Sequence, residues 1–172
     1  MSISDRYDYD NNRGMISQDE LAVIRRRPNI MILGYLNGDE GASMAQCYYA
    51  MFYTLYGAVN MRRDIVSMLK RVRLSFVCAV NADRLQSMWA AYKANERGTL
   101  TAYAKNMRDD GSCTGDGKGV NLKYNFMADV LDNACSVRYR GPEAKSEPEI
   151  KAIFKYLSLI DSNVKSVVIM NK

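Results

Sequence analysis

Histidine is missing from this chain of 172 residues. Its absence removes the commonest general base near neutral pH and every nucleophile arrangement that depends on a Ser–His or Cys–His pair. No spacing of carboxylates or lysines points to another reaction. The sequence therefore predicts that the chain is not an enzyme and has neither catalytic residues nor a cofactor.

Closely spaced cysteine pairs are also missing. The four cysteines, Cys47, Cys78, Cys113 and Cys135, lie far apart and form no C-x-x-C motif. A zinc site would need all four thiolates to converge, because no histidine is present to replace any of them. We therefore predict no metal site, and we expect free thiols that are mostly buried.

Signals for export and for membrane insertion are absent as well. The N-terminal stretch MSISDRYDYDNNRG has no basic, apolar and small residues in the order of a signal peptide. Glycine, asparagine or several tyrosines interrupt the most apolar stretches, residues 30–36 and 42–59. We expect no membrane contact, and a protein that is cytoplasmic or part of an intracellularly assembled particle.

What the chain does contain is mostly helical periodicity. Hydrophobic residues recur at helical spacing, and two capping boxes, Ser17 to Glu20 and Ser146 to Glu149, open further helices. These patterns predict a mainly α, single-domain helical bundle over residues 16–172, with a polar, extended N-terminal arm at residues 1–15. The expected helices begin at Ser17, Ala42, Met61, either Asn81 or Asp83, Asn121 and Ser146.

Two short apolar segments leave the secondary structure open. Residues 30–36 could form a strand or a helical turn, whereas residues 164–170 are β-branched and could form a short C-terminal strand. Such a strand needs a partner. Either residues 30–36 or a neighbouring subunit could provide it.

The segment DDGSCTGDGKGVN, residues 109–121, raises the question of a phosphate-binding loop. The motif G-x-x-x-x-G-K-[ST] fails, because Asp116 stands where its second glycine belongs and Gly119 replaces the hydroxyl residue. Its three aspartates would also repel phosphate, and the pattern of a calcium loop is missing. We interpret this Gly-rich loop as a mobile connection between helices.

Positive charge gathers in the middle of the chain. Basic residues outnumber acidic ones between Met61 and Arg108, although the net charge of the whole chain is only +5. A basic helical face suits backbone contacts with RNA or DNA, and the alternative is an ordinary solvated face. The candidate nucleic-acid-binding residues are Arg62, Arg63, Lys70, Arg71, Arg73, Arg84, Lys93 and Arg97.

Tyrosine and methionine are abundant, with 12 and 11 residues. Both suit surfaces that are buried against another chain. Tyr7 and Tyr9 have no evident core position, so we expect them at a subunit interface of a homo-oligomer. The sequence favours a non-enzymatic structural or assembly protein of the coat (capsid), nucleoprotein or virion-accessory type, viral or phage. The alternative is a helical adaptor or accessory subunit of a larger complex, without nucleic-acid contact.

Overall fold

The computed structural model describes residues 18–94, 104–109, 111, 113–114, 117–126, 133–159 and 163–171. The elements in these residues are α2 (Gln18–Arg26), β1 (Asn29–Leu33), α3 (Gly41–Val59), α4 (Arg63–Leu69), β2 (Arg73–Val77), α5 (Ala82–Lys93), α6 (Pro148–Leu159) and β3 (Val164–Ile169). The predicted arm at residues 1–15 lies outside the described residues, so the division into arm and domain stays a prediction.

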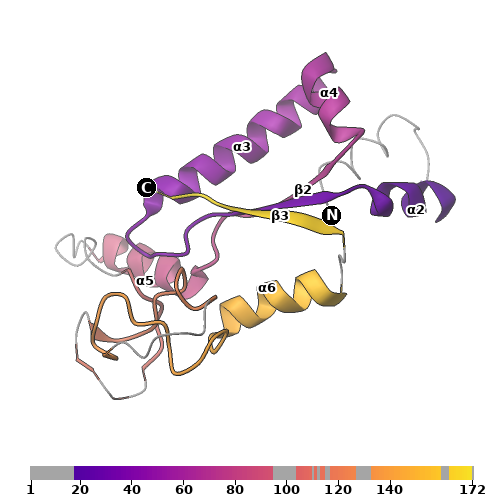
Figure 1. The fold of residues 1–172 in the computed structure, drawn as a ribbon. Helices are drawn as coiled ribbons and strands as arrows, with labels where there is room; N and C mark the ends of the chain where they lie inside the picture. The colour runs from indigo at the N-terminus through magenta and orange to yellow at the C-terminus, as the bar shows by residue number, and fades with distance from the viewer. Residues whose placement is uncertain are drawn as a thin grey trace.

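A parallel sheet forms the centre of the fold. Its strand order is β2-β1-β3, with Leu33 opposite Val77 on one side and Ile169 on the other. Helices α3 and α4 lie on one side of this sheet and α6 on the other (Figure 1). The fold class is therefore α/β with a parallel sheet, and the prediction of a mainly α-helical bundle is wrong.

Strand β1 is buried on both of its faces. Met31 and Leu33 pack in one core cluster with Ile150 and Ile153 of α6. Ile32 belongs to another cluster, with one cysteine of α3 and one that follows β2. A central parallel strand covered on both faces reads as a continuous apolar run without alternation, which explains why its sequence was ambiguous. Residues 164–170 do contain a strand, and of the two partners considered it is the segment 30–36 that pairs with it.

The strand β2 replaces the second half of an expected helix. The periodicity predicted one helix from Met61 onward, but α4 ends at Leu69 and Arg73–Val77 pairs with β1. Helical spacing misled here because Val72 and Phe76 do pack in one cluster with Leu69, as a helix would require, although two different elements carry them. Leu74 and Phe76 alternate as in a strand, but this pattern is too short to stand out from the helical spacing of the residues before it.

The other helices agree with the sequence only in part. Helices begin near Ser17, Ala42, Asn81 and Ser146 as predicted, whereas the described residues after Asn121 form turns instead of a helix. The helix α3 is not buried on all sides, since Tyr49 is 71% exposed. No described helix combines the length and apolarity that crossing a membrane would require.

Two disulfides hold the chain together. Cys47 of α3 is bonded to Cys78 after β2, and Cys113 of the Gly-rich loop is bonded to Cys135. The prediction of free thiols is therefore wrong. Lys105 is buried beside the second bridge, where its Nζ donates hydrogen bonds to the carbonyl oxygens of Gly117 and Ala134 at 2.6 and 2.8 Å. The described residues next to the Gly-rich loop, 104–109 and 121–126, form no helix.

Candidate functional site

The carboxyl ends of the three strands meet at one edge of the sheet, which is the usual place for a ligand in an open α/β sheet. An asparagine follows each strand within a few residues: Asn37 after β1, Asn81 after β2 and Asn171 after β3. Asn37 and Asn81 are buried, whereas Asn171 is exposed. We call Asn37, Glu40 and Asn81 the carboxyl-edge cluster.

The loop from β1 to α3 adopts a strained conformation at this edge. Tyr35 has a φ of 57°, in the left-handed region that a bulky side chain rarely adopts. Its backbone N–H donates to Ser43 Oγ at 3.0 Å, and its hydroxyl donates to the carbonyl oxygen of Gly38 at 2.9 Å. Burial raises the pKa of this hydroxyl, and the nearby Arg84 partly opposes that rise. Strain held by so many contacts is characteristic of functional sites.

The carboxyl-edge cluster contains oxygen atoms without hydrogen-bond donors. Asn37 Nδ2 donates to Glu40 Oε1 at 3.1 Å, and Asn81 Nδ2 donates to the carbonyl oxygen of Leu36 at 3.1 Å. Asn37 Oδ1, Glu40 Oε2 and Asn81 Oδ1 are buried and find no hydrogen-bond partner in the described part of the chain. The three side chains are only 8%, 7% and 0% exposed. Buried polar atoms without partners are costly, so each calls for an explanation.

Residues 104–109 are attached to this edge by backbone contacts. The N–H of Gly38 donates to the carbonyl oxygen of Ala104 at 3.2 Å. Arg84 of α5 is buried, and its guanidinium donates to the carbonyl oxygens of Lys105 and Asn106 at 3.1 and 3.0 Å. Arg84 therefore acts inside the fold and is not a surface contact for nucleic acid.

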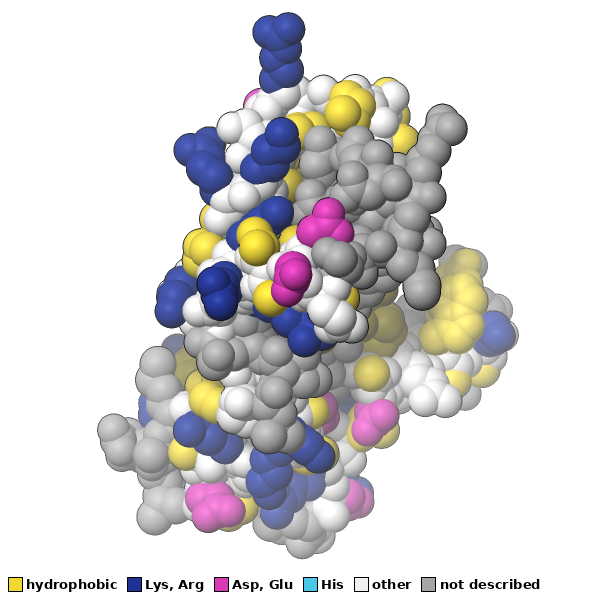
Figure 2. Space-filling model, turned by 90° about the vertical axis from the view of Figure 1, so that its right-hand side faces the viewer, with side chains coloured by type: hydrophobic (Ala, Val, Ile, Leu, Met, Phe, Trp, Pro, Cys, Tyr) yellow, Lys and Arg dark blue, Asp and Glu magenta, His cyan; other side chains and the backbone are white. Residues whose placement is uncertain are grey.

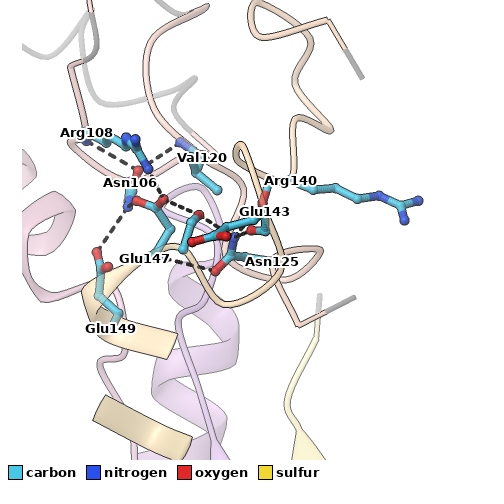
Figure 3. Close-up of polar contacts among 9 residues, drawn as sticks. Asn106, Arg108, Val120, Asn125, Arg140, Glu143, Glu147 and Glu149 are labelled. Carbon is cyan, nitrogen blue, oxygen red and sulfur yellow. Dashed lines mark hydrogen bonds and ion pairs between the residues drawn. The ribbon is translucent and has the colours of Figure 1, made fainter. Parts of the chain in front are cut away.

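A buried glutamate organises the irregular region next to the edge (Figure 3). Glu147 Oε1 accepts hydrogen bonds from Arg108 Nη1 at 2.6 Å and from Ser146 Oγ at 2.7 Å. Its Oε2 accepts from Asn106 Nδ2 at 2.8 Å, and its backbone N–H donates to Asn125 Oδ1 at 3.2 Å. Through its carboxylate and its backbone N–H together, Glu147 thus joins its own segment to residues 104–109 and 121–126, which contain no regular secondary structure.

A cavity of about 470 Å³ opens beside Glu147. Burial raises the pKa of Glu149, which lies at its edge, and the negative charges of Glu147 and Asp83 add to that rise. The hydrogen bond from Asn106 opposes it. Most of the residues that line the cavity are charged or polar: Asp83, Asn106, Met107, Arg108, Ser146, Glu147, Pro148 and Glu149.

The candidate nucleic-acid residues do not form one face. Arg63, Lys70 and Arg71 are exposed around α4, and Lys93 lies at the end of α5, whereas Arg73 is buried like Arg84. Arg62 is paired with Asp64 and lies over the ring of Tyr53. Figure 2 shows basic side chains scattered over one view of the molecule, with apolar and acidic side chains between them. Arg97, Tyr7 and Tyr9 lie outside the described residues.

The carboxyl-edge cluster was missed from the sequence. Neither histidine, nor a cysteine pair, nor clustered charge marks Asn37, Glu40 or Asn81 in the sequence. A usable signal was present: a polar N-G-D-E stretch follows directly on the apolar run of residues 30–36. Polar residues that follow a buried parallel strand mark the ligand edge of a sheet.

Two of the three comparisons with known proteins found matches. The sequence profile of the zinc carboxypeptidases, peptidase M14, matches residues 12–170. No curated protein matches. A crystal structure of thrombin-activatable fibrinolysis inhibitor is 19% identical with a TM-score of 0.65, over 83% of this chain and 34% of that one. The bovine thrombin-activatable fibrinolysis inhibitor, in complex with tick carboxypeptidase inhibitor, is 20% identical with a TM-score of 0.64, over 86% and 46%.

The two structures share the fold with this chain, which spans less than half of the length of either. The family match overturns the hypothesis of a viral structural or assembly protein and its alternative of a helical adaptor. The prediction of a non-enzyme is wrong for the same reason, because the fold is a carboxypeptidase-type enzyme fold, and neither capsid function nor nucleic-acid binding is supported. Because the match extends over most of its length, the chain belongs to the zinc carboxypeptidase family, peptidase M14.

Proposed function

We propose that this chain supplies a peptide-binding edge to a peptidase-like protein of the carboxypeptidase type. The observation that carries the proposal is the set of buried oxygen atoms of Asn37, Glu40 and Asn81 for which the described residues provide no donor. They follow two neighbouring parallel strands, at the edge where ligands of such sheets bind.

The chemistry of these atoms selects the kind of ligand. All three are acceptors, so a complementary ligand must donate hydrogen bonds. A peptide backbone presents N–H donors at regular intervals, which suits acceptors from adjacent strands. A donor that reaches such an atom removes the cost of leaving it unpaired, about 1 to 3 kcal/mol for each buried group.

The surroundings of the cluster favour a preformed site. Hydrogen bonds with Ser43 and Gly38 hold Tyr35 in its strained conformation. Hydrogen bonds from Arg84 hold the backbone of residues 105 and 106 beside the same edge. The neighbouring cavity of about 470 Å³ has the size of an ordinary small-ligand site. Cleavage of a bound peptide is proposed only for the whole protein, because this chain spans 34% and 46% of the two similar structures.

Fluorescence anisotropy with labelled hexapeptides tests the proposal. The set contains apolar, basic and acidic C-terminal residues, each with a free and with an amidated carboxyl end. At least one peptide of the set should bind, and Asn37→Ala should weaken its affinity about tenfold, which corresponds to the loss of roughly one hydrogen bond. Mass spectrometry of the same mixtures reports any loss of the C-terminal residue.

Asn60→Ala is the matched control. Asn60 is exposed at the other end of α3, where its Nδ2 donates to the carbonyl oxygen of Tyr56. This variant should bind as the wild type does. The proposal fails if no peptide of the set binds, or if Asn37→Ala and Asn60→Ala bind the peptide equally well.

A further inference from the structure

The family name implies zinc, so the chain's own residues must be compared with what zinc requires. A catalytic zinc of the carboxypeptidase type is held by two histidines and one glutamate, with water in the fourth position. This chain has no histidine. Its four cysteines are bonded in pairs, and within the described ranges no three His, Cys, Asp or Glu side chains are grouped to hold a metal ion.

The donor atoms at the carboxyl edge are of the wrong kind. The carboxyl-edge cluster offers two amide oxygens and one carboxylate, whereas zinc sites are built from imidazole nitrogens and thiolates together with carboxylates. Oxygen-only sets suit magnesium, calcium and manganese better than zinc. The amide nitrogen of Asn37 cannot replace an imidazole nitrogen, because it donates hydrogens and has no lone pair to offer.

The glutamate of the cluster is already engaged by a different partner. Glu40 Oε1 accepts the hydrogen bond from Asn37 Nδ2. Ser43 Oγ donates to the carbonyl oxygen of Glu40 at 2.7 Å and also receives the N–H of Tyr35, so the first turn of α3 fixes the backbone of this residue. The Asn37 amide thus orients the Glu40 side chain through one of its two carboxylate oxygens.

We infer that this member of the family departs from zinc chemistry at its carboxyl edge: the residues of this chain hold Glu40 by the Asn37 amide and do not form a zinc centre. A zinc-dependent step in the whole protein would need nitrogen ligands from outside these 172 residues. The inference does not depend on peptide binding, since zinc content and peptide affinity are separate measurements.

Zinc retention and melting temperature test the inference. The oxidised chain is loaded with zinc, dialysed against metal-free buffer and analysed by plasma mass spectrometry. The expected zinc content is that of the buffer blank, and the melting temperature should be the same in zinc and in EDTA. Glu40→Gln should melt at or above the wild-type temperature in both, because glutamine keeps the acceptor for Asn37 Nδ2 and adds a donor beside buried acceptors.

Asp39→Asn is the control for zinc that binds to surface carboxylates, because Asp39 is the exposed neighbour of Glu40. Retention of about one zinc per wild-type chain, lost in Glu40→Gln but kept in Asp39→Asn, would overturn the inference. If both variants retain the same amount of zinc, at less than one per chain, that zinc is bound to surface carboxylates. This result would support the inference.

Discussion

Gly119 lies where the Gly-rich loop meets the polar network around Glu147. Its φ is +89°, and a Cβ built on it would lie 2.2 Å from the carbonyl oxygen of Asn106. Gly111 of the same loop also has a positive φ, +73°, but a Cβ there would meet no atom within 4 Å. Both positions need a residue that tolerates a positive φ, but only Gly119 also needs the space that a side chain would fill.

Gly119→Ala should lower the free energy of unfolding by at least about 3 kcal/mol, because strain and a backbone clash add together. Gly111→Ala should cost only about 1 kcal/mol, from the left-handed conformation alone. Urea unfolding followed by circular dichroism measures both values. Equal losses in the two variants would show that Asn106 moves aside without cost.

Glu149 makes the stability of the fold depend on pH. Burial raises the pKa of its carboxyl in the folded state above the ordinary value near 4.5. Between these two pKa values the folded state binds more protons than the unfolded state, so stability falls as pH rises through this window. The stability that Glu149→Gln gains over the wild type should therefore grow with pH across it.

The measurement is urea unfolding of both proteins at several pH values from 4 upward. Glu143→Gln, at an exposed side chain, controls for the loss of one negative charge. A difference between Glu149→Gln and the wild type that stays constant with pH would contradict the predicted direction.

At the scale of elements, helical periodicity located the helices and failed at the sheet. The capping box at Ser146 was sufficient to predict that a helix begins there, and α6 spans Pro148–Leu159. The strand β2 has five residues, and its partner in the sheet, rather than its own pattern, decides its structure. Propensity is weak evidence for so short a segment.

The region between α5 and α6 could not be predicted for a different reason. Its described parts are held by side-chain contacts between distant positions, such as Asn106 with Glu147 and Asn125 with Arg140. Periodicity reports on neighbours along the chain, so it cannot detect such contacts. The asparagines of the candidate site are neutral and follow two different strands, so neither charge nor periodicity marks them in the sequence.

The disulfide between α3 and the end of β2 should contribute strongly to stability. For the sequence separation of 31 residues, the chain-entropy model gives about 3 to 4 kcal/mol, which Cys47→Ala/Cys78→Ala should lose in urea unfolding. Mass spectrometry of an unreduced digest should show residue 47 linked to 78 and 113 linked to 135. Four alkylated cysteines in the unreduced protein would contradict this pairing.

At the scale of the whole molecule, the bridges bear on the compartment. Structural disulfides persist mainly in oxidising surroundings, which weighs against the expected cytoplasmic location. The location stays a prediction, as does assembly into a homo-oligomer. Disulfide mapping on protein from its native source would decide the first, and light scattering would decide the second.

The order of the strands also determines when each edge of β1 can pair during synthesis of the chain. The central strand β1 leaves the ribosome early, yet its neighbour β3 is made on the order of ten seconds later, near the other end of this chain. Until then one row of backbone N–H and C=O groups on a strongly apolar strand has no partner, which invites association between nascent chains. Long-range parallel pairing is also slow. We therefore expect newly made chains to be most prone to association through residues 29–33 in the interval before β3 is made.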